Sequence, residues 1–239
     1  MTTKNIKKSR RRLTPHEVIC PNVPEFNTIA KSFSQNVVDD ISRVIWKAYD
    51  QMKQERFIKN LDQSKQKERR ITRKLEPCIQ KNLSGDEPYY AQHESPELET
   101  CKSPSAHPPA YDIGFILKTD DEIIWPVECK VLQTSEGFTA YQREIEDNFM
   151  TGRYAPFTNS AGMVGYLLKG EPEQALNRIE SKLGVPLKPH PQFFEEEGRP
   201  HKVSSHNRAC SEAYPKAISG NFECHHLIMT MNCQENVAV

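Results

Sequence analysis

The 239-residue chain lacks several features that would place it in a protein class at once. It has no net charge, because 32 Lys and Arg residues balance 32 Asp and Glu residues. The overall charge therefore gives no support for nucleic-acid binding, and any surface that binds a polyanion must be local. No apolar run approaches the length of a membrane span, and no apolar segment of a secretion signal follows the start. We expect a cytoplasmic protein that has no membrane association.

The motifs of several enzyme classes are also missing. There is no G-x-S-x-G, no Walker-type G-x-x-x-x-G-K and no G-x-G-x-x-G, so serine hydrolases, P-loop NTPases and Rossmann enzymes have no support. The seven cysteines are odd in number and scattered, with no C-x-x-C pair, which fits a reduced cytoplasmic protein.

The last third of the chain offers side chains that zinc prefers, but not in the close pairs that mark zinc modules. A zinc site is therefore the less favoured alternative for His201, His206, Cys210, Cys224, His225, His226 and Cys233. A second interpretation places Ser205, His206 and Arg208 in a loop flanking an active site, with His226 on the last strand. Satisfied polar groups near the end of a strand are the simplest interpretation.

The most informative stretch is residues 108–132. It holds two short apolar runs rich in β-branched and aromatic residues, separated by the polar turn 118–122, and this pattern predicts a β-hairpin. Side chains alternate between faces along a strand, so Glu128 and Lys130 project together from the second strand. If the register brings the polar faces level, Asp112 on the first strand meets them at the edge of a sheet.

Two carboxylates and an ammonium in one place have a chemical use. Asp112 and Glu128 offer oxygen ligands to a hard divalent cation, Mg²⁺ or Mn²⁺. Such a cation polarises a phosphodiester and lowers the pKa of a bound water, and Lys130 can position or activate that water. The competing interpretation is an amphipathic hairpin whose Glu128 and Lys130 simply face solvent.

Asp112 followed by Glu128-x-Lys130 on the next strand resembles the core motif of the PD-(D/E)xK nuclease superfamily. Tyr111 stands where the family name has proline, at a permissive position. The resemblance implies an α/β protein of the restriction-endonuclease-like fold, with an αβββαβ core and a mixed central sheet flanked by helices. It covers about residues 63–170.

Three further residues are candidates for the site. Members of this superfamily often carry a glutamate on the helix before the core strands, and Glu68 fits that place, with Glu55 and Glu76 as rivals. Arg143 and Arg153 offer planar forks for phosphate oxygens. The alternative is an exposed ion pair for Arg143 and a helix cap for Arg153.

The rest of the chain suggests one domain with an arm. Residues 1–33 form a basic, mostly irregular N-terminal arm, for which a solvated, frayed terminus is favoured over contact with a phosphate backbone. Residues 34–239 form a single nuclease-like domain. Periodicity predicts helices over 36–61, 63–80 (bent or ended by Pro77), 138–149 and 171–183, strands over 161–168 and about 225–232, and a long loop over 83–109 with a short strand near 88–91.

The expected function is a metal-dependent endonuclease that hydrolyses phosphodiester bonds, in DNA rather than RNA. The segment 149–154 and the strand after it resemble restriction-like proteins of bacterial anti-phage defence, which suggests action against foreign DNA. The alternative is a catalytically inactive nucleic-acid-binding or assembly subunit of the same fold. The resemblance implies a homodimer, because nucleases of this fold often pair to cut both strands. A separate recognition subunit is the other expected partner, because no separate recognition domain is evident in the sequence.

Overall fold

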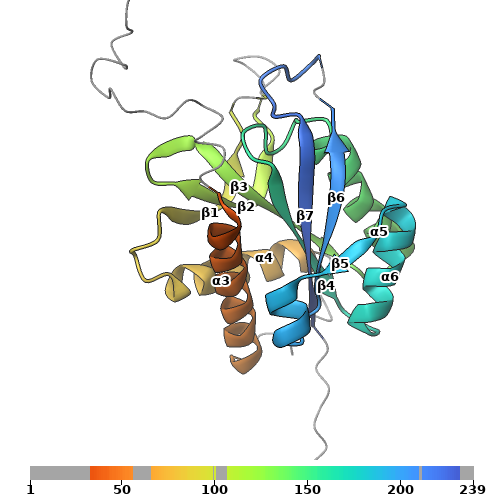
Figure 1. Ribbon diagram of the computed structural model, residues 1–239. Coiled ribbons are helices and arrows are strands. Elements are labelled where there is room, and N and C mark those ends of the chain that lie inside the picture. The colour runs from red at the N-terminus through yellow and green to blue at the C-terminus, as the bar shows by residue number, and fades with distance from the viewer. Residues whose placement is uncertain (1–32, 56–65, 99, 101–106, 210–211, 232–239) are drawn as a thin grey trace, which may run out of the picture.

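A computed structural model of the chain describes residues 33–55, 66–98, 100, 107–209 and 212–231 (Figure 1). At its centre lies a seven-stranded sheet in the order β1-β2-β3-β4-β7-β6-β5. The pairs β3–β4 and β4–β7 are parallel and the other pairs are antiparallel. The strands are β1 (Tyr89–Pro96), β2 (Ala110–Leu117), β3 (Asp120–Val131), β4 (Ser160–Leu167), β5 (Leu187–Pro189), β6 (His201–Arg208) and β7 (Gly220–Thr230).

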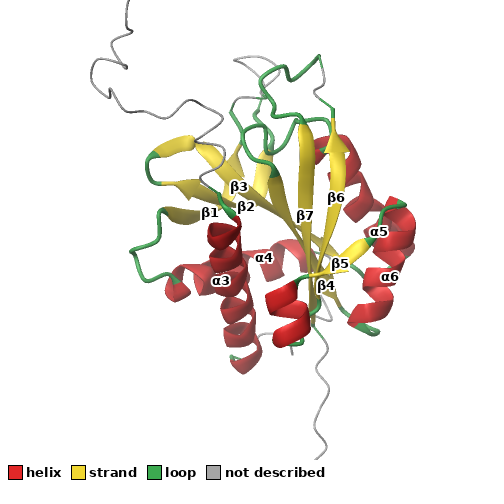
Figure 2. Cartoon of the chain, in the orientation of Figure 1, coloured by secondary structure: helices red, strands yellow, loops and turns green. Residues whose placement is uncertain are grey.

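Helices flank this sheet (Figure 2), so the predicted α/β class with a mixed, helix-flanked sheet is confirmed. Buried residues of α3 (Gln35–Gln54) and α4 (Lys67–Asn82) share one core cluster with the sheet. Buried residues of α5 (Ser135–Arg143) and α6 (Pro172–Leu183) belong to a second cluster. Two π-helices, η3 (Glu144–Phe149) and η4 (Pro191–Glu196), complete the described helices. None of these helices combines the length and the apolar character needed to cross a bilayer.

The first two helices form where apolar residues recur at helical spacing, but their bounds differ from the prediction. α3 buries Val38, Ile41 and Ile45 along one stripe and ends at Gln54, and residues 56–65 lie outside the described chain. α4 continues through Pro77 to Asn82. Proline usually breaks a helix because it cannot donate to the carbonyl four residues earlier. Pro77 is exposed, so the carbonyl that it leaves unpaired lies on the solvent side of the helix.

The central hairpin forms as predicted, whereas other strands are longer than expected. β1 extends through Pro96 within the segment predicted mainly as loop, and β7 begins at Gly220 rather than near residue 225. The predicted strand over 161–168 and the helix over 171–183 are present as β4 and α6. α6 ends at Gly184, whose φ of 65° is the left-handed conformation that a glycine at a helix end adopts readily.

β6 corrects the interpretation of Ser205, His206 and Arg208 as a loop beside the active site. All three lie in a strand that pairs with β7 along its whole length. Arg208 is buried and donates to the carbonyl oxygens of Ile218 (2.6 Å), Ala155 (2.8 Å) and Thr158 (2.9 Å). It therefore anchors the connection before β4. The N-terminal arm falls almost entirely in residues 1–32, which lie outside the described chain.

Candidate active site

The site lies where β2 and β3 separate. Their ladder runs from Leu117 and Asp120 to Ile113 and Val127, while β3 continues to Val131 beside β4. Beyond the ladder, two carboxylates accept hydrogen bonds from backbone amides of β3. Asp112 Oδ2 accepts from the amide of Cys129 at 2.8 Å, and Glu68 Oε2 accepts from the amide of Val131 at 2.9 Å. Strand amides that a neighbouring strand would otherwise bind thus hold two acids in place.

Lys130 stands at the centre of the acids. Its Nζ lies 3.1 Å from Glu128 Oε2, 3.4 Å from Glu144 Oε1 and 3.8 Å from Asp112 Oδ2. The lysine side chain is 13% exposed and that of Glu128 is 5% exposed. The hairpin therefore does bring Asp112, Glu128 and Lys130 together, and burial of this pair contradicts the interpretation of a solvent-facing amphipathic hairpin.

Glu68 reaches the same place from the first turn of α4. Its hydrogen bond to the amide of Val131 holds it next to Lys130 and three residues from Glu128 along β3. The rival Glu55 instead pairs with Lys74, away from the site. Of the two, Glu68 is the glutamate that the structure places beside the strand carrying Glu128 and Lys130.

Glu144 is a member of the site that sequence reasoning missed. The predicted helix over 138–149 is α-helical only to Arg143, and Glu144 opens the π-helix η3, confirmed by a hydrogen bond of 2.8 Å from the Met150 amide to the Ile145 carbonyl. π-turns inside helices frequently mark functional sites. The only available signal was the position of Glu144 three residues after Tyr141 and one before Ile145, both of which are buried.

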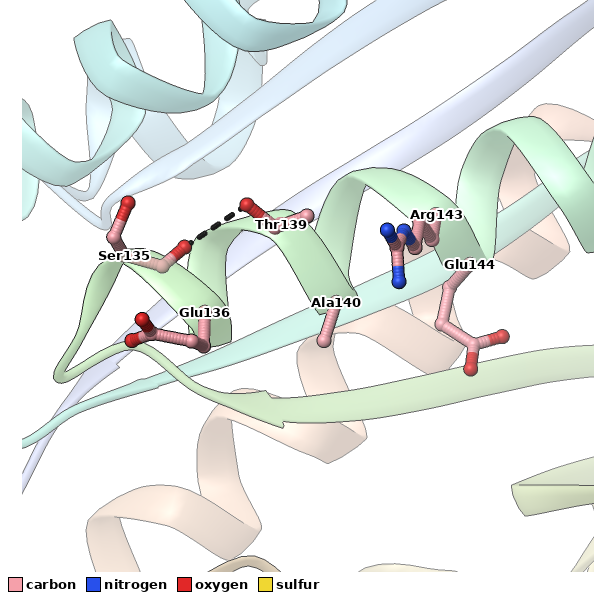
Figure 3. A pocket seen from close by; sticks show the side chains of 6 residues that line it. All are labelled: Ser135, Glu136, Thr139, Ala140, Arg143 and Glu144. Carbon is pink, nitrogen blue, oxygen red and sulfur yellow. Dashed lines mark hydrogen bonds between the residues drawn. The ribbon is translucent and has the colours of Figure 1, made fainter.

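Arg143 and Arg153 lie near the site in different ways. Arg143 is exposed and lines an open groove of about 430 Å³ along α5 (Figure 3). Glu144 lines the same groove, so the groove reaches the residue that contacts Lys130. Arg153 Nη1 donates to Asn148 Oδ1 at 3.0 Å, and Asn148 Nδ2 donates to Glu144 Oε2 at 2.6 Å. Arg153 therefore supports Glu144 through Asn148 rather than capping α5.

Burial and mutual charge shift the pKa values of the site. Burial, and then the charge of Asp112, raise the pKa of Glu128 well above its usual range. Burial also raises the pKa of Glu68, although the charge of Lys130 opposes the shift. Burial alone would lower the pKa of Lys130, but the carboxylates of Glu128, Asp112 and Glu144 outweigh it and raise that pKa. The site is thus rich in negative charge that one ammonium only partly offsets.

This arrangement fits a hard divalent cation. Among the described residues, buried Glu128 Oε1 has no hydrogen-bond partner, which is costly unless another group satisfies it. Carboxylate oxygens are the ligands that Mg²⁺ prefers, and Asp112, Glu128 and Glu68 supply them from neighbouring elements. Over the described residues, no three His, Cys, Asp or Glu side chains already stand in a metal-binding arrangement. Here the Lys130 ammonium lies among the carboxylates and contacts them directly.

The histidines of the last third do not share one place. His225 contacts His201 through Nδ1 and Nε2 at 3.2 Å on the side of α3, where both rings join His190. His226 points to the other face, where Tyr141 Oη lies 2.8 Å from its Nδ1. Alternation along β7 separates these side chains, and Cys210 and Cys233 lie outside the described chain.

Comparison of the chain with protein families, curated proteins and solved structures finds no match.

Proposed function

We propose that this chain is a metal-dependent nuclease of the PD-(D/E)xK type, which hydrolyses phosphodiester bonds in DNA. One observation carries the proposal. Asp112 and Glu128 stand on neighbouring strands around the Lys130 ammonium, and one buried oxygen of Glu128 has no partner in the part of the chain that the structure describes. An unsatisfied buried carboxylate oxygen is rare in proteins and points to a ligand that the polypeptide itself does not provide.

The order of elements around the site gives further support. The segments α4, β1, β2, β3, α5 and β4 follow one another along the chain, which is the αβββαβ order expected of this nuclease core. The acids lie near the ends of these elements, where β2 and β3 separate and where α4 begins. Glu68 comes from α4, Asp112 from β2, and Glu128 with Lys130 from β3.

In this proposal each side chain has a distinct role. Asp112 and Glu128 hold Mg²⁺ or Mn²⁺, and Glu68 assists them. When bound, the cation polarises the phosphodiester and lowers the pKa of a water molecule. Lys130 donates hydrogen bonds that orient the attacking water and offset charge on the phosphate oxygens. The backbone amides of Cys129 and Val131 keep two of the acids from turning away.

A polyanionic substrate also needs positive charge at the rim of the site. Arg70 and Arg73 are exposed on α4, the helix that carries Glu68, and Arg143 is exposed on α5. Arg70 and Arg73 share a helix with Glu68, and Arg143 directly precedes Glu144, which contacts Lys130. Local basic residues of this kind bind phosphates even in a chain that has no net charge.

The proposal is tested by incubating plasmid DNA, single- and double-stranded oligonucleotides and RNA with the protein in Mg²⁺, Mn²⁺ or EDTA. We expect cation-dependent cleavage of DNA that Asp112→Asn and Lys130→Ala abolish. Asp121→Asn at the exposed start of β3 is the matched control and should cleave normally. Tight binding of nucleic acid without cleavage in any cation would instead identify a non-catalytic subunit and refute the enzyme.

A role in defence against foreign DNA is part of the proposal and rests on the likeness of residues 149–154 to restriction-like defence proteins. Its test is the plating efficiency of phages on bacteria that express the chain or its Asp112→Asn variant. Protection that depends on Asp112 would support this setting, and equal plating on both strains would refute it.

A further inference from the structure

We infer that Glu144 is a positioning residue, which holds the Lys130 ammonium beside the cation site and keeps it from competing with the cation for Glu128 and Asp112. The inference rests on the proposed function, because it concerns the same site. It adds a residue that the sequence motif does not contain and gives the π-helix a purpose.

The first argument is the sharing of one ammonium by three acids. Lys130 Nζ lies closest to Glu128, at 3.1 Å, and also contacts Glu144 and Asp112. A divalent cation bound to Glu128 and Asp112 occupies the oxygens that the lysine now contacts. The cation would also repel the nearby ammonium, because like charges at such short range repel strongly at the effective dielectric of a protein surface. The contact to Glu144 is the one that Lys130 can keep when the cation is present.

The second argument is that a hydrogen-bond chain fixes the Glu144 carboxylate through the oxygen that does not face Lys130. Its Oε2 accepts from Asn148 Nδ2 at 2.6 Å, and Asn148 Oδ1 accepts from Arg153 Nη1 at 3.0 Å. These bonds leave Glu144 Oε1 directed at the lysine, 3.4 Å from Nζ. The Glu144 side chain is only 20% exposed, so its charge acts on Lys130 with limited screening by water.

The third argument is the local backbone. The π-helix begins at Glu144, where an α-helix would have continued. A π-turn widens the helix by one residue and is retained where it places a side chain that matters. Here it lies at the residue that contacts the lysine of the motif.

The test is the affinity for Mn²⁺ at one fixed pH, measured by electron paramagnetic resonance of the free ion without nucleic acid. The proteins are the parent chain, Glu144→Gln, Lys130→Met and the double variant, with Glu146→Gln as an exposed control of equal charge change. We expect Glu144→Gln to weaken Mn²⁺ binding about tenfold, or about 1.4 kcal/mol. In the Lys130→Met background the same substitution should change binding less than about twofold, because no ammonium is left to position.

Asn148→Ala is a second variant that keeps every charge of the site. It frees Glu144 Oε2 and should weaken Mn²⁺ binding about threefold, again only when Lys130 is present. Equal losses with and without Lys130 would show a direct charge effect and overturn the inference, as would unchanged binding in Glu144→Gln. A parent chain that binds no Mn²⁺ would overturn the proposed function as well.

Discussion

Replacing Lys130 by Met should destabilise the protein in the absence of divalent cations. In the described part of the chain, Lys130 is the ammonium that contacts Glu128, Asp112 and Glu144 within 4.0 Å, and it is 13% exposed. Removing one partner of a largely buried ion pair costs about 3–5 kcal/mol, because the other charge stays buried without compensation. Glu128 can take up a proton, since its pKa is already raised, so we expect a loss near the lower limit of about 3 kcal/mol. For a chain of this size that loss corresponds to a fall in Tm of about 6–12 °C.

Thermal unfolding followed by circular dichroism at pH 7.5 in EDTA measures this loss, with Lys118→Met in the exposed turn as the control. Mn²⁺ at a hundred times the Kd of the variant should stabilise the variant by about 2.7 kcal/mol. The same Mn²⁺ concentration should stabilise the parent less, because Lys130 already offsets part of the charge on the acids. The difference in Tm between the parent and the Lys130→Met variant should shrink as the pH is lowered towards 5. Burial raises the pKa of Glu128, so on lowering the pH the folded variant protonates Glu128 before the unfolded chain does. This uptake stabilises the folded variant at low pH, and the stabilisation is lost as the pH rises. Equal Tm values for parent and variant in EDTA would refute the reasoning.

Three further outcomes follow from the same structure. Asp112→Asn should reduce cation-dependent cleavage by about a hundredfold or more, yet change the free energy of unfolding by less than about 1 kcal/mol, because the amide oxygen still accepts from the Cys129 amide. Arg208→Ala should destabilise by about 3 kcal/mol in urea unfolding, with unchanged Mn²⁺ affinity in the folded protein, because three carbonyls lose a charged donor. Burial lowers the pKa of His225 and His226 to about 3, so the unfolded chain binds more protons below pH 6.5 and stability falls with pH. Urea unfolding at pH 7 and pH 5 should show a loss of about 2 kcal/mol per histidine, and equal stability would contradict it.

The central hairpin was predictable because its sequence carries strong local signals. Two apolar runs joined by a polar turn define the strands, and alternation along β3 puts Glu128 and Lys130 on one face. The register of the hairpin then brings the acids together, because pairing of Ile113 with Val127 places Asp112 level with Glu128. The helical stripes of α3, α4 and α6 were equally legible because their apolar faces pack on the sheet.

What remained hidden depends on partners distant in sequence. β6 has no apolar alternation in its sequence. It forms a strand because β7 and β5 pair with it, and because Arg208 at its end donates to the carbonyl oxygen of Ala155 in the connection before β4. The change from α- to π-helix at Glu144 leaves the spacing of Phe138, Tyr141, Ile145 and Phe149 unaltered in sequence. The contact of Glu144 with Lys130 therefore could not be inferred from periodicity.

The separation of β2 from β3 gives the molecule two built-in spectroscopic reporters. The amide protons of Cys129 and Val131 each point at a different acid, Asp112 and Glu68. Their nuclear magnetic resonance frequencies respond to the charge on the acceptor, so each follows one carboxylate alone. A titration with Mn²⁺-free Mg²⁺ read at these two protons would therefore reveal which acid meets the ion first, without any substrate.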